Sequence, residues 1–101
     1  MDPERPDIFQ IADVVSSTAG RDQGALFYVI GVEPPYLLLA NGKDRPLDKP
    51  KRKKCKHVEK VLRAETRVAG KLIAGDKVLN SELRRDLADF SQDMQSNNLG
   101  G

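Results

Sequence analysis

The sequence predicts a mainly β protein, with a small five-stranded barrel over residues 9–63 and a short helical appendage over residues 64–90. Up to Arg63, short apolar runs rich in β-branched residues alternate with glycine, proline and asparagine turns and leave no room for a helix. Beyond Arg63, apolar residues recur at a helical spacing of four. A barrel suits a chain this short, because closing the sheet removes edges that it could not otherwise cover. Residues 1–8 and 91–101 are polar and are expected to be flexible tails.

The composition indicates one soluble domain. A chain of 101 residues with 39% hydrophobic and 32% charged residues can build one modest core. No apolar run reaches the length of a membrane-spanning helix, and the first ten residues lack the pattern of a secretory signal. The single cysteine, Cys55, excludes an internal disulfide and a cysteine-rich zinc site. We therefore expect a cytoplasmic protein with no membrane, metal or cofactor.

The first two expected strands flank a glycine loop. The first covers about Ile11–Ser17, and the second, Ala25–Val32, is almost continuously apolar, which predicts a central strand buried on both faces. Gly31 within the second strand indicates a bulge or bend. Gly20 and Gly24 can adopt positive φ and are expected to shape the loop between the two strands.

Three further strands are expected after a Pro-Pro turn. Tyr36–Ala40 is apolar and precedes Asn41-Gly42, the dipeptide most typical of a tight hairpin, so a short strand around Arg45–Leu47 is expected to pair back. Residues 48–56 are too charged for a core element and are expected to form a basic loop that buries nothing. His57–Arg63 is then the last strand, which closes the sheet.

The remaining apolar residues predict two short helices. One covers about Glu65–Ala74 and ends at Gly75. The other runs from Ser81 to about Phe90 and is capped by Asn80 or Ser81. Its apolar stripe is expected to pack on the barrel or, failing that, to serve a partner protein. This stripe consists of Leu79, Leu83, Leu87 and Phe90.

Positive charge is concentrated in one window. The net charge is +2, yet residues 43–63 hold ten of the 17 basic residues and three of the 15 acidic ones. The window therefore carries +7 and the rest of the chain −5. Such a patch attracts polyanions and releases counterions from each phosphate that it neutralises. We expect nucleic-acid binding, mainly through lysine contacts to phosphates, whereas the alternative is a solvated loop kept for solubility.

The expected RNA contacts come from the glycine loop and the basic window. They are Arg21, Lys43, Arg45, Lys49, Lys51, Arg52, Lys53, Lys54 and Lys56. Arg21 is expected either to pair with Asp22 or to contact RNA, and Arg84-Arg85 is interpreted as part of a mixed, solvated helix face. Replacing residues 51–54 by alanine is expected to weaken RNA binding and leave the fold intact.

Catalysis is not expected. Cys55 and His57 lie two positions apart, but a nucleophile and its base need a third, orienting group, and the nearest carboxylate along the chain is Glu59. One cysteine and one histidine are also too few ligands for a metal ion. The sequence therefore predicts neither catalytic residues nor a metal site.

The glycine loop and its flanks resemble a KOW motif, which is a strand, a loop with spaced glycines and a second apolar strand. The resemblance starts at Asp13–Gly24 and 27–32, and continues through 36–42, the basic segment to Val58, and 78–87. It spans roughly residues 10–90. Over this range the chain resembles bacterial KOW-domain RNA-binding proteins, which are related to large-subunit ribosomal proteins of archaea and eukaryotes. The resemblance implies an SH3-like barrel that binds RNA, most often ribosomal RNA, through its loops and one face, without catalysis.

The chain departs from this family in the glycine loop. KOW loops commonly carry lysine beside the second glycine, whereas here the loop reads Arg21-Asp22-Gln23, so the expected phosphate contacts move to Lys49–Lys56. The expected function is a non-catalytic, ribosome-associated RNA-binding domain. Because KOW domains also bind proteins, the alternative is a protein-interaction module that uses the barrel or the C-terminal helix face.

Overall fold

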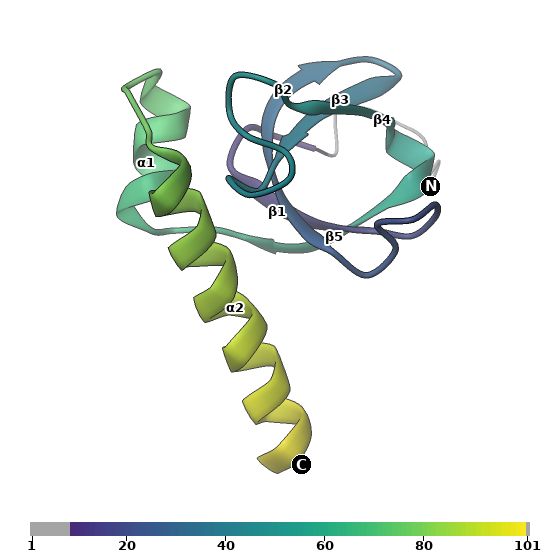
Figure 1. The fold of residues 1–101 in the computed structure, drawn as a ribbon, viewed down its shortest axis with the longest axis vertical. Helices are drawn as coiled ribbons and strands as arrows, with labels where there is room; N and C mark the ends of the chain where they lie inside the picture. The colour runs from purple at the N-terminus through teal and green to yellow at the C-terminus, as the bar shows by residue number, and fades with distance from the viewer. Residues whose placement is uncertain (1–8, 101) are drawn as a thin grey trace.

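In the computed structural model, which describes residues 9–100, five strands form one antiparallel sheet and two helices follow it (Figure 1). The strands are β1 (Asp13–Ser17), β2 (Leu26–Glu33), β3 (Tyr36–Ala40), β4 (Lys51–Lys54) and β5 (Val58–Arg63). The helices are the 3-10 helix η2 (Cys55–His57), α1 (Arg67–Ala74) and α2 (Asn80–Gly100). The predicted class, mainly β with two C-terminal helices, is confirmed. The predicted tail 1–8 lies outside the described residues.

The sheet is curled but open. Its strand order is β4-β3-β2-β1-β5, which leaves β4 and β5 as edges, and no ladder joins these two strands within the described part of the chain. Figure 1 shows the sheet curving round, with η2 leading from one edge strand to the other. The expected closure by backbone hydrogen bonds is therefore not found. The curl and the helices cover the sheet instead.

Two register shifts bend the strands. The β2–β3 pairing shifts between Val29 and Gly31, and the β1–β5 pairing shifts between Val14 and Val15. A bulge bends its strand and increases the local twist, so both shifts favour the curl. A Cβ atom at Gly31 would lie 2.9 Å from Cδ1 of Leu38, so glycine also lets β3 approach closely. The bend predicted at Gly31 is confirmed.

Alternation along the strands creates a hydrophobic core on each face of the sheet. One core packs the sheet against the helices and contains Ala12, Val14, Tyr28, Ala40, Ala64, Val68, Ala69, Leu83 and Leu87. The other lies within the curl and contains Phe9, Val15, Phe27, Val29, Leu37, Leu39, Cys55 and Val58. Strand β2 contributes to both, as its apolar sequence predicted. Leu83 and Leu87 of the predicted stripe are buried on the sheet, whereas Leu79 stays exposed.

A partly buried hydrogen-bond network joins the sheet to both helices. The Tyr28 hydroxyl donates to Oδ2 of Asp86 at 2.8 Å, and the Thr66 hydroxyl donates to the same oxygen at 2.6 Å. Thr66 also caps α1, because its side chain accepts from the backbone N–H of Ala69. Burial raises the pKa of Tyr28, and Asp86 raises it further by accepting a hydrogen bond from the phenol. The phenol therefore remains a hydrogen-bond donor in the core.

The connection between β3 and β4 differs from the predicted hairpin. No strand forms around Arg45–Leu47, and residues 41–50 instead make a long connection. The side chain of Asn41 organises it, because Oδ1 accepts from the backbone N–H groups of Lys43 and Arg45 at 2.9 and 3.0 Å. The side chain of Asn41 thus holds a loop together in place of the predicted tight hairpin turn. The strand that pairs with β3 begins only at Lys51.

The helix boundaries are partly as predicted. Helix α1 ends at Gly75, which has φ 78°, so this predicted terminator is confirmed. Helix α2 continues past its predicted end near Phe90 to Gly100, so the predicted tail 91–101 is helical up to that residue. Between Asn80 and Leu99 the sequence has no glycine or proline that would stop a helix.

We expect Gly42→Ala to destabilise the protein by about 2 kcal/mol or more, because Gly42 has φ 77° and a Cβ there would collide with the carbonyl oxygen of Asn80. Gly70→Ala is the control. It lies in α1 with nothing within 4 Å of an added Cβ, and should stabilise by about 0.5–1 kcal/mol. Urea unfolding measures both changes, and equal midpoints for the two variants would contradict the close packing at Gly42.

Candidate nucleic-acid interface

The basic stretch that was predicted to be a loop contains the edge strand β4. Side chains alternate along a strand, so Lys51 and Lys53 share one face, and Arg52 and Lys54 share the other. Lys53 is only 8% exposed, whereas Arg52 and Lys54 are open to solvent. The prediction that this segment buries nothing is wrong, because pairing with β3 draws Lys53 into the molecule. Replacing all of residues 51–54 would therefore disturb the fold.

Asp22 in the glycine loop binds both inward-facing lysines. Nζ of Lys51 lies 2.7 Å from Oδ2 of Asp22, and Nζ of Lys53 lies 3.0 Å from Oδ1. Lys53 also donates to the carbonyl of Ala19 at 2.8 Å. The Ser17 hydroxyl adds a further hydrogen bond to Asp22 at 2.9 Å. These contacts fasten the glycine loop to β4.

The surroundings of Asp22 keep its carboxylate charged. Burial, the largest single influence, would raise its pKa. The hydrogen bonds from Lys51, Lys53 and Ser17 together outweigh burial and hold the pKa well below the usual range of an aspartate. Of the two alternatives expected for Arg21, the ion pair with its neighbour Asp22 is not formed, and Arg21 is exposed. Gly20 and Gly24 have the positive φ that was predicted, 86° and 88°, and turn the loop around this cluster.

A hollow of about 350 Å³ lies beside the Asp22 cluster, between the glycine loop and the connection 41–50. We call it the loop hollow. Its lining residues are Arg21, Asp22, Gln23, Ala25, Asp44, Arg45 and Lys51. The structure thus brings Arg21 and Arg45 together from two loops. Neither guanidinium has a carboxylate within ion-pair distance in residues 9–100.

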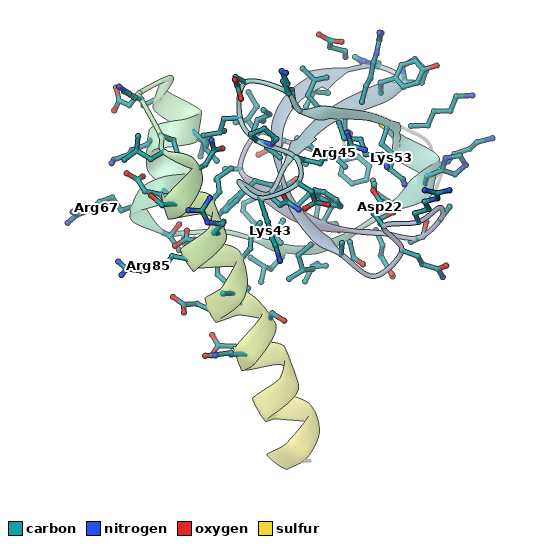
Figure 2. The ribbon with its side chains drawn as sticks, in the orientation of Figure 1. Asp22, Lys43, Arg45, Lys53, Arg67 and Arg85 are labelled. Carbon is teal, nitrogen blue, oxygen red and sulfur yellow. The ribbon has the colours of Figure 1, made fainter. Side chains whose placement is uncertain are left out.

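A second hollow of about 470 Å³, the helix hollow, lies between the same loops and α2. Its lining residues are Gly24, Ala25, Leu26, Asn41, Lys43, Asp44, Arg84, Leu87, Ala88 and Ser91. Because Ala25 and Asp44 line both hollows, the two adjoin. Figure 2 shows Lys43 on the side toward α2, with Asp22 and Lys53 next to each other within the curl.

The other predicted contacts lie away from these hollows. Arg52 has its guanidinium 4.5 Å from the centre of the Tyr36 ring and 3.8 Å from the Glu33 carboxylate. Lys54 and Lys56 line a separate hollow of about 200 Å³. Lys49 is exposed on the connection 41–50. The predicted set is therefore dispersed. Four members line the two hollows, Lys53 is bound by Asp22, Arg52 and Lys54 lie on the outer face of β4, and Lys49 and Lys56 lie on neighbouring segments.

The cysteine and histidine do not form a nucleophilic pair. Cys55 is buried in the core within the curl of the sheet, and burial raises the pKa of its thiol. A buried, neutral thiol is a poor nucleophile. Among the described residues, no three His, Cys, Asp or Glu side chains are grouped so that they could hold a metal ion.

Arg84 is the residue of this region that the sequence reading missed. Its guanidinium Nη1 donates to the Gly42 carbonyl at 2.6 Å and it lines the helix hollow, although we interpreted it as part of a solvated helix face. One signal was available. Arg84 directly follows Leu83 of the apolar stripe, and a long side chain at the border of a stripe can reach over the neighbouring element.

No protein-family model and no curated protein matches this chain. The KOW relationship therefore stays a prediction. Over the part of the chain that the structure describes, neither helix combines the length and the apolar character that crossing a bilayer requires.

We expect Asp22→Asn to lower the stability at pH 7 by about 2 kcal/mol, because it leaves Lys53 buried without a charged partner. The folded pKa of Asp22 lies below its unfolded value of about 4, so its contribution is present above that pH and is lost as the pH falls toward the folded pKa. The stability gap to the unchanged protein should therefore shrink below about pH 4.

The control for this measurement is Asp44→Asn. The pKa of Asp44 is also lowered, first by its hydrogen bond from Asn41, but the side chain is exposed and should contribute less than about 1 kcal/mol. Urea unfolding between pH 2 and pH 7 compares the variants. A gap for Asp22→Asn that stays constant over this range would show that its charge does not stabilise the fold.

Proposed function

We propose that this chain is a non-catalytic, ribosome-associated RNA-binding domain of the cytoplasm, which contacts RNA phosphates at the loop hollow and the helix hollow. One observation carries the proposal. Arg21, Lys43 and Arg45 line adjoining hollows, and within residues 9–100 none of them has a carboxylate at ion-pair distance. The nearby carboxylate of Asp22 is already neutralised by two lysines.

The shape of the site favours a polyanion over a small anion. A concave surface with a net positive charge focuses the electrostatic potential and raises the local concentration of an anionic ligand. The cations stand at several points around two connected hollows, which suits a ligand that carries several phosphates in a row. Contacts of this kind fix the position of RNA without reading its bases, so specificity would come mainly from RNA shape.

The fold supports the same proposal through the KOW resemblance. An SH3-like barrel of this family has a curled antiparallel sheet with a glycine loop between its first two strands, and this chain has both features. The sheet would then be such a barrel with its β4–β5 seam open. The resemblance implies binding through loops, and both hollows are lined by loop residues. Ribosomal RNA is the proposed ligand because it is the most frequent ligand of that family.

A protein-interaction module is the second candidate function. It is favoured by two large apolar side chains of the helical region that remain exposed, Ile73 at 66% and Leu79 at 51%. A partner protein that covered these side chains would remove their apolar surface from water. In this case the basic hollows would steer an acidic partner and Ile73 and Leu79 would be buried by it.

The decisive comparison uses two double variants that remove the same charge. Arg21→Ala with Arg45→Ala removes two cations of the loop hollow, whereas Arg52→Ala with Lys54→Ala removes two from the outer face of β4. Fluorescence anisotropy with ribosomal RNA fragments at several salt concentrations gives the slope of log affinity against log salt. The first double variant should reduce this slope by about 1.5, because two phosphate contacts are lost. The second should leave it nearly unchanged.

If both double variants reduce the slope equally, RNA binding depends on the overall charge of the protein and not on the loop hollow. If the unchanged protein binds no ribosomal RNA at low salt, the RNA-binding proposal is wrong and the protein-interaction module takes its place. All four side chains are exposed, so circular dichroism should show an intact fold in both variants.

A further inference from the structure

The connection 41–50 is held in place by the first turns of α2. Arg84 donates to the Gly42 carbonyl at 2.6 Å, and the side chain of Asn80 accepts from the backbone N–H of Leu47 at 2.8 Å. Gly42 also packs so closely on α2 that an added Cβ would lie 3.1 Å from Cβ of Leu83. The helix therefore sets the shape of the connection that carries Lys43 and Arg45.

Arg84 keeps donors available beyond this contact. A guanidinium has five N–H donors in a rigid plane, and the Gly42 carbonyl is the one acceptor it binds within residues 9–100. That bond restrains the side chain, so less of its freedom remains to be lost when a phosphate binds. No carboxylate of the described chain lies within ion-pair distance of Arg84.

The helix hollow has room for a phosphate next to Arg84 and Lys43. Its volume is about 470 Å³, and three of its lining residues, Gly24, Ala25 and Ala88, have at most a methyl side chain. A Cβ added at Gly24 would meet no atom within 4 Å, so the space in front of this residue is open. Small side chains leave room for a sugar-phosphate backbone to approach, and the cations supply the attraction.

Asp44 lies where the two hollows meet, and its charge is locally compensated. Its Oδ1 accepts a hydrogen bond from Nδ2 of Asn41 at 2.9 Å. That bond is the main cause of its lowered pKa, and the positive charges of Arg45 and Lys43 lower it further. The junction is thus a carboxylate between two cations, and the lining as a whole stays positive.

The opposite side of α2 offers a natural comparison. A third hollow of about 440 Å³ contains Arg85, the neighbour of Arg84, together with Arg67, Lys71, Glu82 and Asp86. Here Lys71 is paired with Glu82 at 3.2 Å, so one cation of this hollow is already bound by one of its carboxylates. The charged lining residues sum to +1 in this hollow and in the helix hollow, so the two differ in where their charges lie and not in net charge. Figure 2 shows Arg67 and Arg85 pointing away from the sheet and from Lys43.

We propose that Arg84 and Lys43 form a second phosphate-binding subsite, in the helix hollow. An RNA strand that contacts Arg21 and Arg45 in the loop hollow continues past Ala25 and is held at a further phosphate by α2. The subsite rests on the proposed function, which it deepens, because it makes α2 part of the RNA-binding surface and defines the path of the strand.

The test measures how five single variants bind a fluorescein-labelled single-stranded RNA of about 12 nucleotides, again as a function of salt. Arg84→Ala removes one positive charge, and Ala88→Glu adds one negative charge inside the helix hollow while keeping the Arg84 donor to Gly42. Arg85→Ala and Ser81→Glu make the same charge changes in the third hollow and serve as matched controls. Arg84→Lys keeps the charge but loses the planar group.

Arg84→Ala should reduce the salt slope by about 0.7, the value for one phosphate contact on a single strand, and weaken binding about ten-fold at low salt. Ala88→Glu should weaken binding to a similar extent, and Arg84→Lys should retain most of the slope. The two control variants should bind like the unchanged protein.

Three results would overturn the subsite. If Arg84→Ala behaves like Arg85→Ala while the Arg21 and Arg45 double variant still loses affinity, the subsite is absent and the proposed function stands. If Arg84→Ala weakens binding but Ala88→Glu does not, Arg84 only holds the connection 41–50 in place. If the unchanged protein binds neither this strand nor ribosomal RNA, the proposed function fails together with the subsite.

Discussion

The carboxylate of Asp22 joins parts of the sheet that do not pair through their backbones. It lies in the loop between β1 and β2, yet it binds two lysines of β4, which is separated from β1 by β2 and β3 in the sheet. Such a contact is possible because the sheet curls. It also satisfies Lys53, a buried cation that would be very costly without a partner. Side-chain ion pairs thus connect this end of the sheet, where no backbone ladder closes it.

The same principle separates structural cations from cations that are available to a ligand. Asp13 is fully buried and has Lys60 and Arg63 of β5 at 3.2 and 3.5 Å. Together with Asp22, it engages four of the basic residues of the window 43–63, which are Lys51, Lys53, Lys60 and Arg63. The remaining charge near the hollows comes from residues on loops and on α2. A count of basic residues along the chain therefore overstates the contribution of β4 and understates that of the loops.

The helices are part of this arrangement and not an addition to it. The Tyr28–Thr66–Asp86 network and the core between the sheet and the helices fix α1 and α2 on the sheet. With α2 in place, Asn80 and Arg84 can hold the connection 41–50 through two hydrogen bonds. The positions of Lys43 and Arg45 therefore depend on packing on the far side of the sheet. The hollows exist because three separate segments meet at this point.

Local features of the sequence determined much of the fold. Short apolar runs between turn residues located β1, β2, β3 and β5. Apolar residues at helical spacing located α1 and the first half of α2. Gly31 indicated a bend in β2, and Gly75 indicated the end of α1. Tertiary structure alone decided which charges meet, because Asp22 and Lys51 are 29 positions apart and Gly42 and Arg84 are 42 apart. Backbone preferences act between near neighbours and leave a local pattern, whereas an ion pair between distant residues forms only after the chain has folded.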